Sequence, residues 1–219
     1  MMPYFTSFPM IAPLLWGLYA GLATGLAGLV GVRAHSLFKK EKNKLGILGM
    51  PRAGKTRFLC NLRGEPYIGK QTEKEQYEPF TYTKRDGKKI AIDKGEDIGG
   101  TDQYIDEYER IINESDVIFY FLNIYKYLYG NNIDYVRYCN MRLELIYGFI
   151  QNPNNSINKV VLVGSHIDRC NESREKVVKE FYKKVENKQY YPMLKNIYLI
   201  DITREEDIKS FADKIFYEK

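Results

Sequence analysis

Histidine and cysteine are both scarce in this chain, with two and three copies respectively among 219 residues. Cys60, Cys139 and Cys170 are odd in number, scattered and never spaced as C-x-x-C, which argues against a metal or redox site and for reduced thiols. His35 and His166 are too few for a histidine-based metal centre. Any catalysis must therefore come from other groups, and we expect Mg²⁺ and backbone amides.

Charged side chains are absent from residues 1–32, and residues 8–32 form an apolar run long enough to cross a hydrocarbon core as a helix. A cleaved signal peptide would need a positively charged start, which this segment lacks. We therefore predict one N-terminal transmembrane helix, with residues 1–32 as the anchor. Its glycines repeat every fourth residue, at Gly17, Gly21 and Gly25, which favours homo- or hetero-oligomers formed through this helix.

Positive charge is concentrated immediately after that run. Residues 33–44 hold five cations and one anion, a net charge of +4, whereas the whole chain carries +5. Residues 45–219 therefore carry only +1, which argues against a basic face for nucleic acid. We predict that residues 33–44 are a basic juxtamembrane linker. The positive-inside rule would then place the N-terminus outside and the remaining domain in the cytoplasm as a single-pass membrane protein.

Residues 49–56 read G-x-x-x-x-G-K-T, the spacing of a phosphate-binding loop. Gly49 and Gly54 let the backbone curl so that its N–H groups point at phosphate oxygens. Lys55 adds a cation for the β- and γ-phosphates, and Thr56 offers a hydroxyl to Mg²⁺. An apolar strand over residues 44–48 and a helix over residues 57–63 would flank the loop, so the phosphates would lie at a helix N-terminus.

The nucleotide contacts predicted from this loop and the helix start are Gly49, Arg52, Ala53, Gly54, Lys55, Thr56 and Arg57.

The rest of the chain alternates between strand and helix patterns. Residues 65–79 are polar and predict a loop, and residues 80–83 and 89–92 predict a β-hairpin around an Asp-Gly turn. Helices are expected near residues 103–113, 133–150, 173–186 and 205–216, and strands near 117–122, 160–163 and 197–200. This alternation predicts an α/β domain over residues 45–219, with a doubly wound, mostly parallel sheet.

The order of a phosphate loop, a polar loop with a threonine, a D-x-G-G segment and a strand ending in S-H-x-D resembles the small GTPases of the Ras-like superfamily. The resemblance covers residues 45–219. Residues 97–100 are most similar to the second switch of the ADP-ribosylation-factor branch. A membrane anchor ahead of such a domain is similar to the β-subunit of the signal-recognition-particle receptor.

This resemblance implies a Mg²⁺ site and a phosphate sensor. Thr56 would bind Mg²⁺ directly and Asp97 would hold it through water, while the Gly100 N–H would sense the γ-phosphate. A further Mg²⁺ ligand would be the threonine of the first switch, for which Thr72 is the first candidate. Thr81 and Thr83 are the alternatives.

The resemblance also implies a guanine site. Asp168 would accept two hydrogen bonds from the guanine edge, which adenine cannot supply. Ser165 and His166 stand where the family usually has Asn and Lys, so they would contact the base in altered form. The alternative is that Asp168 only caps a helix.

Hydrolysis of GTP is expected to be slow. Thr101 follows Gly99-Gly100 where many relatives place a water-orienting glutamine, and Gln103 lies two residues further on. Lys55, Gly100 and Thr101 would then form the catalytic set, and Arg52 or an arginine of a partner could supply the missing charge.

The sequence thus favours a membrane-anchored, Mg²⁺-dependent GTP-binding switch that binds a protein effector and hydrolyses GTP slowly to GDP and phosphate. One alternative is a non-hydrolysing scaffold stabilised by nucleotide, with tyrosines between residues 120 and 138 as its docking surface. Another is an ATP-binding phosphate-loop protein.

Overall fold

The structure is a computed structural model that describes residues 43–69, 74–100, 106–151 and 159–216. Within these ranges the α-helices and strands, in chain order, are β1 (Leu45–Gly49), α2 (Lys55–Arg63), β2 (Lys74–Tyr77), β3 (Phe80–Thr83), β4 (Lys89–Ile92), β5 (Gly95–Ile98), α3 (Asp106–Glu114), β6 (Val117–Asn123), α4 (Ile124–Leu128), α5 (Ile133–Ile150), β7 (Lys159–Ser165), α6 (Arg174–Val185), β8 (Ile197–Ile200) and α7 (Glu205–Ile215). Short 3₁₀ turns follow β7 and α6, at Ile167–Arg169 (η2) and Tyr191–Met193 (η3).

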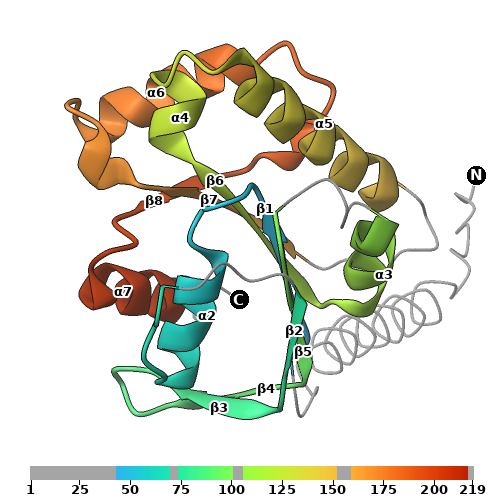
Figure 1. The fold of residues 1–219 in the computed structure, drawn as a ribbon, viewed down its shortest axis with the longest axis vertical. Helices are drawn as coiled ribbons and strands as arrows, with labels where there is room; N and C mark the ends of the chain where they lie inside the picture. Colours follow the sequence, from blue (N-terminus) through green and yellow to red (C-terminus); the bar gives the residue numbers. More distant parts are fainter. Residues whose placement is uncertain (1–42, 70–73, 101–105, 152–158, 217–219) are drawn as a thin grey trace, which may run out of the picture. The chain divides into compact units, whose positions relative to one another are not determined.

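Six strands form one sheet in the order β2-β5-β1-β6-β7-β8 (Figure 1). Four neighbouring pairs run parallel, and only β2 runs antiparallel, against β5. The carboxyl ends of β1, β5, β6, β7 and β8 therefore meet at one edge. The prediction of an α/β domain with a mostly parallel sheet is confirmed.

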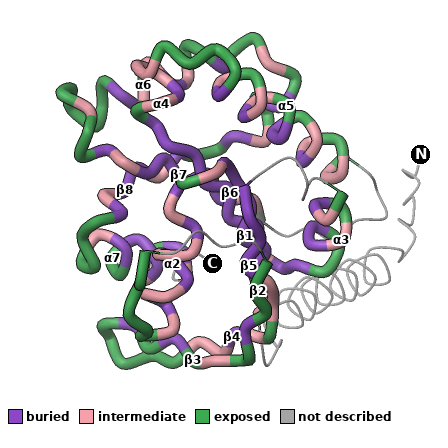
Figure 2. The backbone as a smooth tube through the Cα atoms, viewed as in Figure 1, coloured by how far each residue is buried: buried purple, intermediate pink, exposed green. Residues whose placement is uncertain are grey.

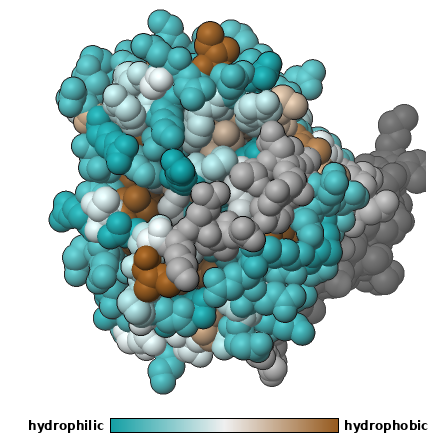
Figure 3. Space-filling model, in the orientation of Figure 1, coloured by the Kyte–Doolittle hydropathy of each residue, from teal (hydrophilic) through white to brown (hydrophobic). Residues whose placement is uncertain are grey.

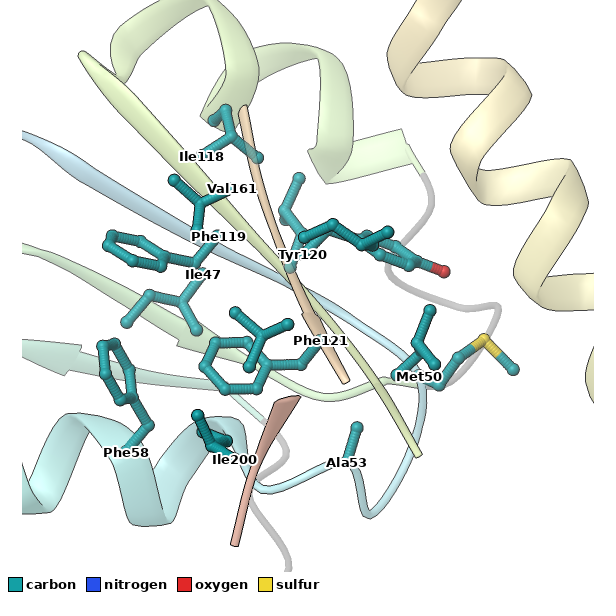
Figure 4. Packing of buried hydrophobic residues seen from close by; sticks show 14 of the residues in the cluster. Ile47, Met50, Ala53, Phe58, Ile118, Phe119, Tyr120, Phe121, Val161 and Ile200 are labelled. Carbon is teal, nitrogen blue, oxygen red and sulfur yellow. The ribbon is translucent and has the colours of Figure 1, made fainter. Parts of the chain in front are cut away.

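β6 lies in the middle of the sheet, and its sequence explains why. Six of its seven residues are buried, because a central strand packs on both faces (Figure 2). Phe119 and Phe121 point to one side of the sheet and Tyr120 to the other (Figure 4). On the first side, Phe58 of α2 packs against Phe119 and Phe121, with ring centroids 5.3 and 5.2 Å apart.

Helices cover both faces of the sheet. α2 and α7 lie on one side and α3 and α5 on the other (Figure 1). Phe211 of α7 joins the ring cluster of Phe58 and Phe119, whereas the Tyr120 hydroxyl donates to the Cys139 carbonyl of α5 at 3.3 Å. The sheet is therefore doubly wound, as the alternating pattern predicts.

Capping side chains mark where several helices begin. Asn132 and Ser173 precede α5 and α6 and accept hydrogen bonds from the Tyr135 and Lys176 amides at 2.9 and 3.3 Å. Asn123 does the same for α4, accepting from the Lys126 amide at 3.0 Å. The Asn123 cap turns the chain immediately after β6, at the edge where the strand ends meet.

The hairpin of β3 and β4 has the predicted bounds but forms its own two-stranded sheet. It is attached to α7, because the Tyr82 hydroxyl donates to the Asp213 carboxylate at 2.7 Å. Arg85 in the hairpin turn also pairs with Glu206 and Asp213 of α7. The polar segment predicted as a loop contains β2, so that expectation was wrong for residues 74–77.

The predicted transmembrane helix is corrected. Among the residues described by the structure, no helix combines the length and the apolar character needed to cross a bilayer. The longest, α5, contains Asp134, Arg137, Arg142 and Glu144 within its 18 residues. Residues 1–32, on which the prediction rested, lie outside the described residues. Over the described residues the fold class is a mixed α/β domain, and the membrane localisation drawn from that helix is withdrawn.

The surface seen in Figure 3 is mainly hydrophilic where it is described, and hydrophobic side chains occur there as separate patches. Among the described residues the large exposed hydrophobic side chains include Ile133 on α5 and Ile68 after α2. Tyr120, Tyr127 and Tyr135 are buried. The tyrosines between residues 120 and 138 thus belong largely to the core, which does not favour a docking surface there.

Candidate functional site

The loop between β1 and α2 has the backbone shape expected of a phosphate loop. Gly49, Arg52 and Gly54 have φ angles of 137°, 56° and 90°, so the chain turns three times through the left-handed side of φ/ψ space. A Cβ on Gly54 would lie 2.6 Å from Ile202 Cγ1, so both its conformation and its surroundings require glycine. Ala53 is fully buried and lies at the edge of the core shown in Figure 4.

Lys55 lies under this loop, at the first position of α2, and only 6% of it is exposed. Its Nζ donates to the carbonyls of Gly49 and Met50 at 3.3 and 3.1 Å. Burial lowers the pKa of Lys55 to about 8, with nearby Asp97 acting in the opposite direction. A buried ammonium at a helix N-terminus is an arrangement that attracts an anion.

Thr56 and Asp97 supply the oxygen atoms suited to Mg²⁺. Thr56 is half-buried in the first turn of α2, and Asp97 is buried on β5, in register with Ile47 of β1. Within the described residues, no three His, Cys, Asp or Glu side chains gather to hold a metal by themselves. Mg²⁺ with a nucleotide needs only one or two protein oxygens plus phosphates and water, so these residues fit it.

Gly100 lies against the phosphate loop. A Cβ at this position would be 2.3 Å from the Pro51 nitrogen and 2.5 Å from the Met50 carbonyl carbon, so only glycine fits. Its carbonyl accepts a hydrogen bond of 2.7 Å from Arg142 Nη1. The segment that begins with Asp97 thus ends in direct contact with the loop predicted to hold the phosphates.

The five remaining residues of the predicted switch segments differ in where they lie. Thr72, Thr101 and Gln103 lie outside the described residues. Thr81 and Thr83 are exposed on β3, which lies near the carboxyl end of α2 rather than at the phosphate loop (Figure 1). The structure therefore does not bring these two alternatives to the site.

The loop after β7 carries the predicted base-binding residues. Ser165 is fully buried, and its hydroxyl donates to the Leu122 carbonyl at 3.1 Å. Because that hydroxyl has one proton, the 2.9 Å contact with His166 Nδ1 requires Nδ1–H to donate to Oγ. Burial lowers the pKa of His166, which favours a neutral ring with an acceptor at Nε2.

Asp168 follows on the 3₁₀ turn η2, at the same sheet edge, and is exposed. The turn after β8 lies beside it. Asp201 acts electrostatically on His166, and Ile202 packs against Gly54 of the phosphate loop. The structure thus brings the ends of β1, β7 and β8 together.

Arg57, predicted to contact nucleotide, makes two contacts within the protein. Its Nη2 donates to the Thr203 carbonyl at 2.9 Å, and its guanidinium lies over the Tyr67 ring. The turn that Arg57 holds is itself closed by Asp201, whose carboxylate accepts from the Thr203 amide and hydroxyl at 2.9 and 2.6 Å. Arg52, by contrast, is exposed in the loop.

Sequence reasoning missed two residues of the site. Arg142 of α5 is buried and donates to Gly49 as well as Gly100, and the Tyr108 hydroxyl accepts from the Gly49 amide at 3.3 Å. A signal was present for Arg142, since it occupies the same buried face of α5 as Cys139 and Leu143. An arginine in such an apolar stripe needs polar partners inside the protein.

No protein-family model matches this chain, and no match to it is found among curated proteins.

Proposed function

We propose that this chain is a Mg²⁺-dependent GTP-binding switch protein related to the Ras-like GTPases, with slow intrinsic hydrolysis of GTP to GDP and phosphate. The observation that carries the proposal is the loop over residues 49–56, in which left-handed turns precede a helix that begins with the buried Lys55. Backbone amides, a helix N-terminus and a buried ammonium together favour a polyphosphate over other ligands.

Each part of the chain would have a separate task. Lys55 and the loop amides would neutralise the phosphate oxygens, and the oxygens of Thr56 and Asp97 would orient Mg²⁺. The metal, when bound, supplies charge stabilisation at the transferring phosphoryl group. The Gly100 amide would face the terminal phosphate, and its contact with Pro51 keeps it beside the loop.

Guanine preference rests on Asp168 with support from the neighbouring loops. An exposed carboxylate at the sheet edge can accept two hydrogen bonds from N–H groups of guanine, and the neutral His166 ring offers a flat surface beside it. Residues 201–203, which approach both His166 and the phosphate loop, would close the other side of the base.

The switch function requires a protein partner that distinguishes the two nucleotide states. The segment from Asp97 to Gly100 ends against the phosphate loop, so loss of the terminal phosphate would change the surroundings of its last residue. The partner would bind differently because the protein surface next to Gly100 differs between the two nucleotide states.

The first test is direct identification of the nucleotide that copurifies with the full-length protein, followed by titration with fluorescent GTP and ATP analogues with and without Mg²⁺. We expect guanine nucleotide, a requirement for Mg²⁺, and single-turnover hydrolysis that takes many minutes. Folded protein that takes up neither nucleotide at millimolar concentration would refute the proposal.

The base assignment has its own test. Asp168→Asn should weaken GTP binding and improve binding of xanthosine triphosphate, because the amide donates where the carboxylate accepts. Asp134→Asn, an exposed aspartate on α5, is the matched control and should leave both affinities unchanged. Equal binding of ATP and GTP by the wild type would instead favour the ATP-binding alternative.

A further inference from the structure

Arg142 is a buried cation in the middle of helix α5. Only 2% of it is exposed, and buried Cys139, Leu143 and Ile146 lie on the same helix face. Burying a guanidinium is costly unless hydrogen bonds compensate for the lost water. The hydrogen-bond partners of this side chain therefore identify the segments of the protein that it stabilises.

These contacts join two strand ends that are far apart in the sequence. Arg142 Nη1 donates to the Gly100 carbonyl at 2.7 Å, and the same nitrogen lies 3.4 Å from the Gly49 carbonyl and 3.3 Å from Met50 Sδ. Gly49 ends β1 and Gly100 follows β5, so one side chain of α5 spans the phosphate loop and the segment beside it. The short bond to Gly100 is the strongest of the three.

Gly100 is held from the opposite side as well. A Cβ there would collide with the backbone of Met50 and Pro51, so the residue packs directly on the loop. A glycine backbone has much more rotational freedom than any other residue. With its Cα against the loop and its carbonyl on Arg142, that freedom is removed and the peptide planes on either side are oriented.

Arg142 is also coupled to Lys55. Both side chains approach the Gly49 carbonyl, Lys55 Nζ at 3.3 Å and Arg142 Nη1 at 3.4 Å. Asp97 is the anion near Lys55. The two buried cations, Lys55 and Arg142, outnumber the one buried carboxylate, Asp97. The site therefore has a net positive charge before any phosphate binds.

We propose that Arg142 is a positioning residue that fixes the Gly100 peptide for the terminal phosphate, so that the preference for nucleoside triphosphate over diphosphate depends on it. This inference rests on the proposed function. The loop amides and Lys55 would serve the phosphates common to both nucleotides. Gly100 would contact only the third phosphate, which the diphosphate lacks. Arg142 acts through Gly100 without touching the nucleotide.

The experiment compares full-length wild type, Arg142→Lys and Arg142→Met in the presence of Mg²⁺. The measured quantity is the ratio of the Kd for a fluorescent GDP analogue to the Kd for a non-hydrolysable fluorescent GTP analogue. We expect Arg142→Met to lower this ratio about tenfold, the usual effect of losing one charge-assisted hydrogen bond. Arg142→Lys should fall between, because it keeps the charge but not the planar fork.

Arg137→Met is the matched control, since Arg137 lies on the same helix with its side chain exposed and paired with Asp134. It should leave the ratio unchanged. A second readout uses no nucleotide: hydrogen exchange at the amides of residues 49, 50, 52–54, 99 and 100 should become faster in Arg142→Lys. If Arg142→Met does not fold, Arg142→Lys carries both measurements.

The possible failures can be distinguished. If both Arg142 variants weaken the two nucleotides equally, or leave the ratio and the exchange rates unchanged, the residue has only a structural role and the inference is wrong. If wild-type protein binds no nucleotide at all, the proposed function fails and this inference fails with it.

Discussion

At the scale of single residues, Lys55 combines two opposing requirements. In the proposed function its charge would attract phosphate, but its burial lowers the pKa to about 8 and so disfavours that charge. The carbonyls of Gly49 and Met50 partly compensate by accepting from its ammonium group. Burial of the Lys55 charge therefore does not favour the stability of the protein without nucleotide, which agrees with the proposed role of this residue in binding phosphate.

Replacing Lys55 by methionine should separate binding from stability. Lys55→Met should weaken nucleotide binding by more than about 100-fold, because it removes a buried charge from the phosphates. The free energy of unfolding without nucleotide should change by less than about 1 kcal/mol. The lost hydrogen bonds are offset by relief of a burial cost of about 3 kcal/mol, which corresponds to the lowered pKa.

Urea unfolding and nucleotide titration check this prediction, with Lys88→Met as the control because Lys88 is exposed in the hairpin turn. The control should change neither quantity. A Lys55→Met protein that binds nucleotide normally would contradict the role given to the loop.

The titration of Lys55 also predicts a pH dependence. Bound phosphate favours the charged lysine and raises its pKa above about 8, so binding takes up a proton at higher pH. Nucleotide affinity should be nearly constant below about pH 7 and fall roughly tenfold between pH 7.5 and 9. Stability of the empty protein should change in the opposite sense, gaining from this group as pH rises from 8 toward the unfolded value of 10.5.

Kd measurements from pH 7 to 9 test this sign. Lys55→Arg is the control, because arginine stays charged throughout and should remove the decline that lysine causes. An identical pH profile in both proteins would show that another group titrates.

The residues of the site differ in how far they could be predicted. Residues 49–56 form a contiguous motif, and their local spacing alone specifies the turn and the helix start. Arg142 lies 42 positions after Gly100, and its contact with the Gly100 carbonyl exists only because α5 packs over that edge of the sheet. Such a contact depends on tertiary packing, which no local pattern encodes.

At the scale of elements, the β3–β4 hairpin and α7 depend on each other. Tyr82 is buried and its hydroxyl donates to the Asp213 carboxylate at 2.7 Å. Tyr82→Phe should lower the free energy of unfolding by about 1–2 kcal/mol, because it leaves a hydrogen bond to a charged group unmade. Urea unfolding of the full-length protein measures this loss.

Tyr67→Phe serves as the control, since Tyr67 is 44% exposed. It should unfold at the same urea concentration as the wild type. Equal losses in the two variants would mean that the hydroxyl of Tyr82 does not join the hairpin to α7.

The elements that sequence patterns predicted are those with continuous apolar faces. β6, α5 and β8 have the expected bounds within one residue because burial imposes clear periodicity on them. β2 escaped prediction because three of its four residues are exposed and only Tyr77 is buried. An edge strand is stabilised by its partner's backbone, here β5, so its side chains need no hydrophobic pattern.

At the scale of the whole molecule, ligand binding should stabilise the entire fold, because the site joins the ends of β1, β7 and β8. Mg²⁺–GDP at 100 times its Kd should add about 2.7 kcal/mol to the free energy of unfolding. For a protein of this length that corresponds to an increase in Tm of roughly 5–10 °C. ATP at the same concentration should give a much smaller shift.

Thermal unfolding followed by circular dichroism measures this shift, and Lys55→Met should show none. A Tm that rises equally with ATP would argue against guanine selectivity. The overall fold was predictable because alternating strands and helices leave few arrangements. The membrane helix was predicted from an uncharged apolar run and the basic stretch after it, and it is corrected because no helix among the described residues can span a membrane.

The contact of Gly54 with Ile202 and the bond from Arg57 to the Thr203 carbonyl join the start of the domain to a turn near its end. During synthesis on the ribosome, the loop over residues 49–56 emerges long before that turn exists. We expect that a nascent chain halted before residue 197 retains little nucleotide, whereas one released after residue 216 retains it fully. Nucleotide binding would then depend on synthesis of the domain as far as that turn.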